Sequence, residues 1–462
     1  MRYISTRGGA DPVDFVTASL AGLAPDGGLY TPEAYPQIAR PSANGSYAET
    51  ATRILKAFAG DALDESVVSR LAQDAYAAFS HQSVAPLVQM GPNQWMMELH
   101  HGPTLAFKDV AMRFIAQLYD YALAQRGERM TIMCATSGDT GGAAAAAFAG
   151  LSNVDVVILH PHNRISPTQR LFMAATGAGN IHNLALEGDF DGCQAIVKAL
   201  FADEQFKRRV NLSGVNSINW TRIAAQSVYF ATAQAQLGAE TPIRFVVPSG
   251  NFGDALAGYV AARCGLLAGF ECQVAVNAND AMVHLFQGAP MKKGTTTPTA
   301  SPAMDIQIPS NFERLLFEAA SRDGAAVRGA YDALAGKGEA PLPEAAVGPL
   351  GCMGFSAASV SDAETFEEMR RTRAETGWLV CPHTAVGLAA ARRAPETDAA
   401  TIVLSTAHAA KFPETVLEAT GADASLPERS QEFVSRGEAY ETGPMDLAHV
   451  RARTEALSRV VA

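Results

Sequence analysis

The stretch that decides the fold is residues 243–254, which read IRFVVPSGNFGD. A β-branched and aromatic run, typical of a buried strand, leads into a turn rich in glycine and asparagine, and a helical pattern follows from Ala255 to about Arg263. The unpaired N–H groups and the dipole at the start of such a helix favour an anion. The turn from Gly250 to Asp254 therefore predicts a phosphate or carboxylate cradle, with a ligand-free tight turn as the open alternative.

The same order of strand, turn and helix recurs along the chain. Residues 130–142 read MTIMCATSGDTGG and run into an alanine-rich helical pattern. Helical patterns also follow Lys108, up to Gly127, and run from Asn219 to Leu237 before Gly238. Further buried strands are expected at 154–159, 272–276 and 401–404. Strands that alternate with helices predict an α/β fold with a mostly parallel sheet.

The N-terminal part of the chain has a different sequence pattern from the rest. The first 80 or so residues have helical patterns and turn clusters, so we expect an N-terminal lobe over 1–85 and a larger α/β region over 86–462. Two stretches near 288–303 and 335–348 are rich in Pro with Thr and Lys or with Gly and Glu, which is typical of surface insertions. The first of them is a candidate lid.

Composition narrows the class of protein. The 462 residues carry a formal charge of −11, from 36 basic and 47 acidic residues, and no basic run that would favour nucleic acid. The N-terminus has no apolar signal-peptide core, and the apolar stretches are shorter than the roughly 20 residues of a membrane span. Six cysteines without a C-x-x-C pair favour reduced thiols. We therefore expect a cytoplasmic protein with no membrane or nucleic-acid partner.

The sequence lacks the motifs of several common kinds of catalytic site. The sequence has no G-x-x-x-x-G-K-[ST], no G-x-G-x-x-G after a strand, no H-E-x-x-H and no G-x-S-x-G. The close histidine pairs at 100–101 and 160–162 have no Cys or carboxylate partner at metal-ligand spacing, so we expect no metal site.

One lysine stands in an unusual setting. Residues 98–109 read ELHHGPTLAFKD, and Lys108 follows an apolar Leu-Ala-Phe run at the start of the helical pattern. A lysine held in apolar surroundings can have a lowered pKa and act as a nucleophile or base, because Schiff-base formation needs the neutral amine. A helix-end lysine that extends to water is the more frequent alternative on spacing alone.

These motifs together resemble the threonine synthases, pyridoxal phosphate (PLP) enzymes of fold type II in the tryptophan-synthase-β-like group. The resemblance covers nearly the full chain and is to the longer bacterial and fungal form. It rests on motifs in the same order at residues 3–8, 26–30, 101–109, 136–141, 216–222, 250–254, 301–306, 310–314 and 404–412. It implies two interleaved catalytic α/β lobes of mostly parallel sheets flanked by helices, plus an N-terminal helical lobe.

The resemblance implies a role for each matching residue. Lys108 would form the Schiff base with PLP and later move protons at Cα and Cβ of the substrate. The PLP phosphate would be held by Gly250, Asn251, Phe252, Gly253 and Asp254. Thr406 would hydrogen-bond the pyridine nitrogen. The substrate carboxylate or the cofactor ring would face Ser137, Gly138, Asp139 and Thr140. The substrate phosphate would be held by Ser217 and Arg222. Some relatives carry asparagine in place of Asp139, and an acid in place of Cys381.

The implied activity is that of a carbon–oxygen lyase, which converts O-phospho-L-homoserine and water into L-threonine and phosphate. Two alternatives stay open. A threonine-synthase-like phospholyase would release phosphate without making threonine, and a non-catalytic homologue would keep the fold alone. The resemblance favours a monomer, with a homodimer possible.

Overall fold

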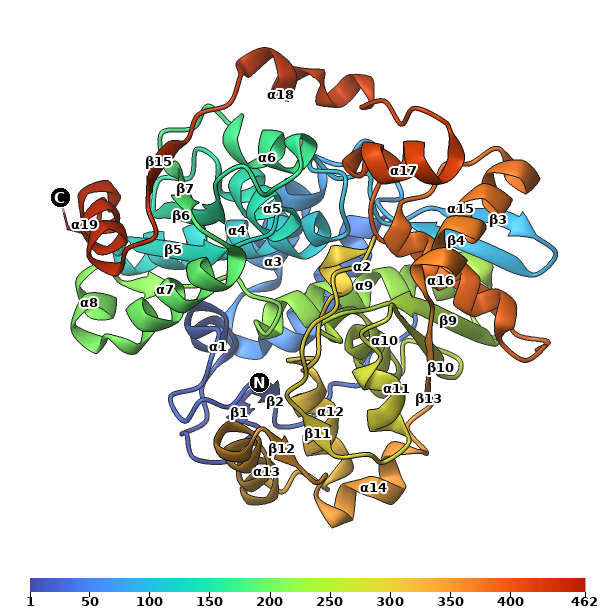
Figure 1. The fold of residues 1–462 in the computed structure, drawn as a ribbon. Helices are drawn as coiled ribbons and strands as arrows, with labels where there is room; N and C mark the ends of the chain where they lie inside the picture. The colour runs from blue at the N-terminus through green and yellow to red at the C-terminus, as the bar shows by residue number, and fades with distance from the viewer. Residues whose placement is uncertain (462) are drawn as a thin grey trace.

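The computed structural model describes residues 1–461, and two larger sheets organise the chain (Figure 1). The six-stranded sheet has the order β13-β10-β9-β14-β4-β3, in which only β3 runs antiparallel to its neighbour. Its strands are β3 Leu87–Gly91, β4 Gln94–Glu98, β9 Ile243–Pro248, β10 Glu271–Val276, β13 Phe355–Ser359 and β14 Ala400–Ser405.

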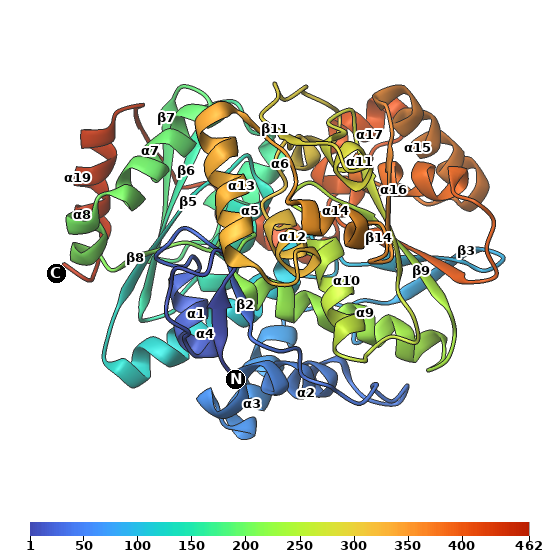
Figure 2. The same cartoon turned by 90° about the horizontal axis from the view of Figure 1, so that it is seen from below.

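The second sheet is parallel throughout, in the order β15-β7-β6-β5-β8. Its strands are β5 Met130–Ala135, β6 Val154–Pro161, β7 Ile181–Glu187, β8 Leu212–Ser213 and β15 Glu441–Pro444. In Figure 2, β5 to β8 lie at the left and strands β3, β9 and β14 at the right, so the two sheets occupy opposite sides of the molecule. The predicted α/β class is confirmed, and the five strands expected between 130 and 404 are present.

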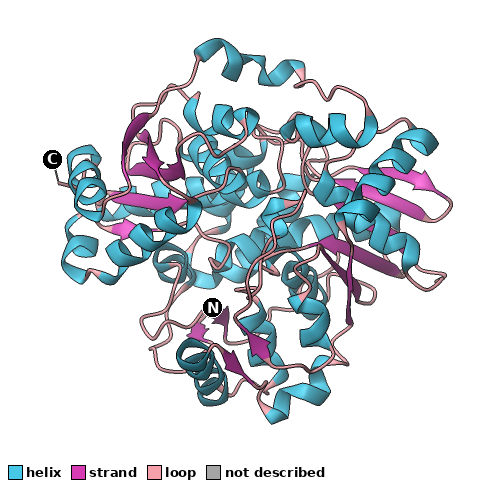
Figure 3. Ribbon diagram, viewed as in Figure 1, coloured by secondary structure: helices cyan, strands magenta, loops and turns pink. Residues whose placement is uncertain are grey.

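Helices surround both sheets (Figure 3). In chain order they are α1 Phe15–Ala21, α2 Tyr47–Ala59, α3 Glu65–Tyr76, α4 Lys108–Arg126, α5 Asp139–Phe148, α6 Pro167–Ala174, α7 Phe190–Ala202, α8 Glu204–Arg209, α9 Trp220–Leu237, α10 Gly253–Arg263, α11 Ala281–Phe286, α12 Phe312–Ala319, α13 Gly324–Lys337, α14 Glu344–Leu350, α15 Asp362–Thr376, α16 Pro382–Arg393, α17 Pro413–Thr420, α18 Gln431–Arg436 and α19 Leu447–Leu457. Among residues 1–461, none is long and apolar enough to cross a membrane.

The two helices that carry the site begin and end where the sequence predicts. Helix α4 ends at Gly127, whose left-handed conformation (φ 63°) lets its N–H bond the last turn. Helix α9 begins after Asn219, whose side chain accepts a hydrogen bond from the N–H of Thr221. The Asn219 cap fixes the start of α9 and so the position of Arg222 in its first turn.

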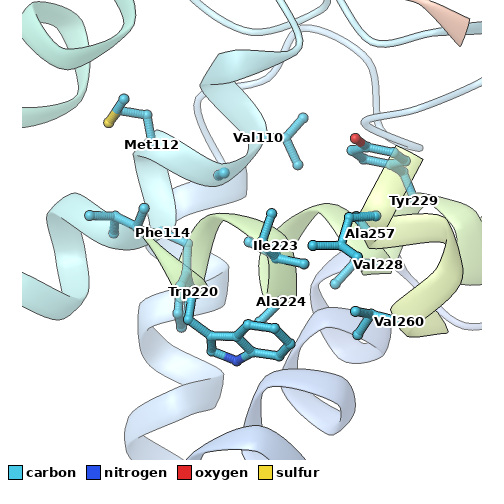
Figure 4. Packing of buried hydrophobic residues seen from close by; sticks show 14 of the residues in the cluster. Val110, Met112, Phe114, Trp220, Ile223, Ala224, Val228, Tyr229, Ala257 and Val260 are labelled. Atoms are coloured by element: carbon cyan, nitrogen blue, oxygen red, sulfur yellow. The ribbon is translucent and has the colours of Figure 1, made fainter. Parts of the chain in front are cut away.

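The main core lies where α4, α9 and α10 pack together (Figure 4). Phe114 of α4, Trp220 and Ile223 of α9 and Val260 of α10 are buried there. The N-terminal segment contributes to the same core, because the ring of Phe58 lies 5.7 Å from the ring of Trp220. The division at residue 85 stays a prediction.

The N-terminal segment also contains a small antiparallel pair, β1 Tyr3–Ser5 and β2 Tyr30–Pro32. The two stretches predicted as insertions meet through a similar pair, β11 Met291–Lys292 and β12 Glu339–Ala340. The C-terminal segment leaves α17 and arches over the molecule through α18, and β15 then joins the edge of β7 (Figure 1). The C-terminal segment thus links the two sheet bodies.

The buried side chain of Arg314 ties three segments together. Its guanidinium donates to the Tyr30 carbonyl from Nε at 2.9 Å and from Nη2 at 2.7 Å, and Nη2 also donates to the Ile218 carbonyl at 2.6 Å. Each buried carbonyl that loses its hydrogen-bond donor lowers the free energy of unfolding by about 1–3 kcal/mol.

We therefore expect Arg314→Met to lower the free energy of unfolding by about 3 kcal/mol, measured by urea denaturation. The control is Arg53→Met, because Arg53 donates to the Ala39 carbonyl from an exposed site. Equal losses in the two variants would contradict the role of Arg314.

Candidate active site

The functional segments follow neighbouring strands of the six-stranded sheet. Strand β14 pairs with β4 (Ser405 opposite Glu98) and with β9 (Val403 opposite Val246). Because the carboxyl ends of parallel strands meet at one edge, the Lys108 loop, Thr406 and the 250–254 turn are brought to the same edge. A parallel sheet uses this edge for its ligands.

A tight loop holds Lys108 at the first position of α4. The Thr104 N–H and hydroxyl both donate to Asp109, at 2.8 and 2.7 Å, and Leu105 takes a left-handed conformation (φ 61°). The Phe107 N–H donates to the Thr406 carbonyl at 2.8 Å, so the loop is fastened to the end of β14. Lys108 and Thr406 therefore have a fixed spacing.

The Lys108 side chain is largely buried, at 12% exposed, and lies beside a carboxylate from the helix that follows a strand of the second sheet. Its Nζ lies 3.2 Å from Oδ2 of Asp139, the first residue of α5. Burial lowers the pKa of Lys108, Asp139 acts against that shift, and the positive charges of Lys411 and Arg222 add to it. Lys108 therefore loses its proton to give the neutral amine more readily than an exposed lysine does.

Asp139 is shared by two lysines. Its Oδ1 lies 2.8 Å from Nζ of Lys411, and Gln169 donates to the same oxygen at 3.4 Å. Burial alone would raise the pKa of Asp139, but the ammonium groups of Lys108 and Lys411 hold it well below its usual range. Asp139 therefore stays ionised.

The turn predicted as a phosphate cradle ends in open N–H groups at the start of α10. Phe252 takes a left-handed conformation (φ 60°) before α10, and no residue among 1–461 accepts the N–H groups of Gly253, Asp254 or Ala255. A Cβ on Gly250 would lie 2.7 Å from the Ala303 carbonyl oxygen, so only glycine fits there. The open donors point to an anion that the protein itself does not supply.

A neighbouring segment holds the cradle in place. The Asn311 N–H donates to the Asn251 carbonyl at 3.1 Å, and the Ser310 hydroxyl donates to Oδ1 of Asn251 at 3.0 Å. These bonds leave the cradle's own N–H groups free. The residues present therefore fit PLP, since an amine for its aldehyde, open N–H groups for its phosphate and a hydroxyl at Thr406 meet at one edge.

The side chains of Asp254 and Arg222 lie within electrostatic reach of each other, at the start of α10 and in the first turn of α9. The Tyr229 hydroxyl donates to Oδ1 of Asp254, and burial raises the pKa of Asp254 to about 7. The side chain of Asp254 is thus directed toward α9, so that its backbone N–H is the part that faces the cradle. Burial lowers the pKa of Arg222 to about 10, against the effects of Tyr229 and Asp254.

Arg222 is a buried cation with unused donors. It donates to the Val215 carbonyl at 3.3 Å, but its Nε has no partner among the described residues. A buried guanidinium with open N–H groups favours an oxyanion such as phosphate, because its planar fork can bind two oxygens. This burial agrees with the predicted contact to the substrate phosphate.

The turn before α5 offers further donors. The Thr136 hydroxyl accepts the N–H groups of Gly138 and Gly141, at 2.9 and 3.1 Å, which bends the turn. The N–H groups of Asp139 and Thr140 have no acceptor within residues 1–461. Gly138 has a φ of 143°, and a Cβ there would lie 2.5 Å from the Gln169 side chain. The turn is thus shaped to receive a small anion.

The structure brings Lys108, Asp139, Arg222 and Asp254 within electrostatic reach of one another. Ser137 is exposed, while Thr140 and Ser217 are half-buried, and the roles of these three and of Thr406 stay predictions. No group of three His, Cys, Asp or Glu side chains in the described chain could hold a metal.

Sequence reasoning missed four residues of the site: Lys411, Gln169, Tyr229 and His383. The signal for Lys411 was present, because it stands in an Ala-Ala-Lys-Phe run as apolar as the run before Lys108. The other three have no such signal, since their positions become meaningful only when helices α6, α9 and α16 pack.

We expect Gly250→Ala to weaken PLP binding by about tenfold or more, because the added Cβ pushes the cradle away from the Ala303 carbonyl. The dissociation constant is measured by titrating the cofactor-depleted protein and following its absorbance. Gly336→Ala is the matched control, since no atom lies within 4 Å of its Cβ. Unchanged binding in Gly250→Ala would show that the close approach is not required.

Comparison with known proteins agrees with this geometry. The family model described as "Pyridoxal-phosphate dependent enzyme" matches residues 84–406, and those of the threonine synthase N terminus and C-terminal part match 2–76 and 384–453. The threonine synthase of Pseudomonas aeruginosa is 43% identical over 459 residues, which covers 98% of this chain and 97% of that protein.

Solved structures agree as well. The crystal structure of PLP-bound threonine synthase from Brucella melitensis has a TM-score of 0.95 and 44% identity, and covers 99% of this chain and 100% of that one. The yeast threonine synthase has a TM-score of 0.92 and 34% identity, over 99% and 98% of the two chains. The expected fold type II is confirmed, and the chain belongs to the threonine synthase family of PLP-dependent enzymes.

Proposed function

We propose that this protein converts O-phospho-L-homoserine and water into L-threonine and phosphate. One observation carries the proposal: the largely buried Lys108 amine lies at the edge where an open N–H cradle and the buried Arg222 guanidinium also gather. Membership of the threonine synthase family supports the same reaction.

Two separate sites for phosphate match a phosphorylated substrate used with a phosphorylated cofactor. The N–H groups of Gly253, Asp254 and Ala255 would hold the PLP phosphate, because backbone donors bind it without adding charge. The Arg222 guanidinium, with Ser217 nearby in the sequence, would hold the phosphate of the substrate and later the released phosphate. The substrate carboxylate would lie at the N-terminus of α5, near Thr140.

Lys108 is the residue that moves protons. PLP, when bound, supplies an electron sink for the negative charge that develops on the substrate carbons. Lys108 takes a proton from Cα and one from Cβ, the phosphate leaves Cγ toward Arg222, and Cγ gains a proton and becomes the methyl group. The hydroxyl of a water molecule then adds at Cβ, the remaining proton of that water goes to the released phosphate, and a proton returns to Cα. The lowered pKa of Lys108 suits this work, because a general base must be neutral to accept a proton.

We also propose a monomer in the cytoplasm whose partner is a small-molecule substrate and not nucleic acid. Burial raises the pKa of Cys134 and of Cys264 to about 12, which is the behaviour of unreactive core thiols and supports a reducing compartment. The acidic net charge of −11 supports the absence of a nucleic-acid partner.

Lys108→Ala should abolish the visible absorbance of the covalently held cofactor and lower kcat by about 10⁴-fold or more, since both the anchor and the base are lost. Absorbance and steady-state kinetics measure the two effects. A variant that keeps both would place the chemistry on another residue.

Arg222→Ala should raise KM for O-phospho-L-homoserine by about 100-fold and change PLP binding by no more than about threefold. Arg222→Lys should fall between, because it keeps the charge but loses the planar fork. Equal losses of substrate and cofactor binding would show that Arg222 serves the cradle instead.

The products separate the proposal from its alternatives. With O-phospho-L-homoserine, threonine and phosphate should form in equal amounts, measured by chromatography and a phosphate assay. Phosphate accompanied by a 2-oxo acid and ammonia would identify a phospholyase, and no product would identify a non-catalytic homologue.

A further inference from the structure

A second buried lysine shares the carboxylate that lies beside Lys108. The Nζ of Lys411 is 2.8 Å from Oδ1 of Asp139, while the Nζ of Lys108 is 3.2 Å from Oδ2. Each oxygen of Asp139 therefore has its own ammonium group. The three side chains come from α4, from the first turn of α5 and from the segment that follows β14.

Lys411 is more fixed than Lys108. It is 1% exposed, it donates to the Thr104 carbonyl at 2.9 Å, and its Nζ lies 5.4 Å from the centre of the Phe172 ring. Thr104 belongs to the loop that also holds Lys108. The contacts of Lys411 therefore join Asp139 to that loop, and no part of the proposed reaction needs Lys411 to move or to lose its proton.

Lys108 alone could not serve as the partner of Asp139 throughout the reaction. The proposed role of Lys108 requires it to be neutral each time it accepts a proton. At that moment a buried carboxylate with no other cation would be left unpaired, which is strongly unfavourable. Asp139 would then resist the deprotonation of Lys108 and would repel a substrate carboxylate at the N-terminus of α5.

We propose that Lys411 is a positioning residue that neutralises Asp139 permanently, so that Lys108 can lose its proton and an amino-acid carboxylate can approach the start of α5. With both lysines charged, the group carries a net charge of +1, and it becomes neutral when Lys108 gives up its proton. The inference rests on the proposed function, because that function gives Lys108 its role as base.

The other groups around Asp139 do not replace Lys411. His383 of α16 faces it, but burial lowers the pKa of His383 to about 4, so the ring is neutral near pH 7. Cys381, at the start of α16, is a buried thiol with a raised pKa, and Gln169 of α6 is uncharged. Arg222 of α9 is charged and acts on Lys108, yet it makes no ion pair with Asp139 among the described residues.

The test is a double-mutant cycle in the PLP-loaded enzyme with Lys411→Met, Asp139→Asn and the combined variant. Lys411→Met should lower kcat/KM by about 100-fold, with a raised KM. The acidic limb of its kcat–pH profile should move to higher pH, because Asp139 now attracts the Lys108 proton alone. The combined variant should recover at least about tenfold over Lys411→Met, since no unpaired charge remains.

Two controls separate this role from a purely structural one. Lys56→Met removes a lysine that donates to the carbonyls of Gly60 and Leu63, far along the chain from the site, and should change thermal stability without moving the pH profile. If Lys411→Met does not fold, Lys411→Gln carries the same test, because its amide can still donate to the Thr104 carbonyl.

The proposal is overturned if the folded, PLP-loaded Lys411 variant keeps the wild-type pH profile and KM, or if adding Asp139→Asn gives no recovery. Threonine formation by the wild-type enzyme is measured in the same series. If the wild-type enzyme forms no threonine, the proposed function itself is wrong, and this outcome is distinct from a failure of the Lys411 proposal.

Discussion

The burial of the Lys108 amine is the constraint on which the rest of the structure depends. A lysine is rarely buried, and an unpaired ammonium group inside a protein is expensive unless it finds a carboxylate or gives up its proton. Here Asp139 supplies the carboxylate from the start of α5, while the loop bonded to Thr406 fixes the position of the lysine. The site therefore exists only because the two sheet bodies are packed against each other.

The chain binds anions although it is acidic overall, with a net charge of −11. Backbone N–H groups are open at the N-termini of α5 and α10, and such donors can bind an anion without a charged side chain. Of the charged side chains that remain at the site, Arg222 and Lys411 are buried and Lys108 is 12% exposed, so their effect on an anion is screened little by salt. The structure thus concentrates positive potential at one edge.

Local pattern predicted five buried strands and both turns, but on spacing alone the lysine at the start of α4 was more often expected to extend to water. It predicted the cradle because glycines at Gly250 and Gly253 after a β-branched run indicate a close approach of the backbone. It could not predict how Asp139 is neutralised, because the Lys411 side chain reaches the Thr104 carbonyl across 307 residues of sequence. It also could not show that the Asp254 carboxylate bonds Tyr229 of α9. Both contacts depend on how the helices pack, and a short sequence motif does not specify that packing.

Two lysines of the site, Lys108 and Lys411, lie against one carboxylate, and the covalent bond with PLP is expected on Lys108. Borohydride reduction of the PLP-loaded protein, followed by digestion and mass spectrometry, fixes the cofactor on the lysine that carries it. We expect the added pyridoxyl mass on the peptide containing Lys108 and none on the peptide containing Lys411. Label on Lys411, or on any lysine outside the site, would contradict the assignment of Lys108.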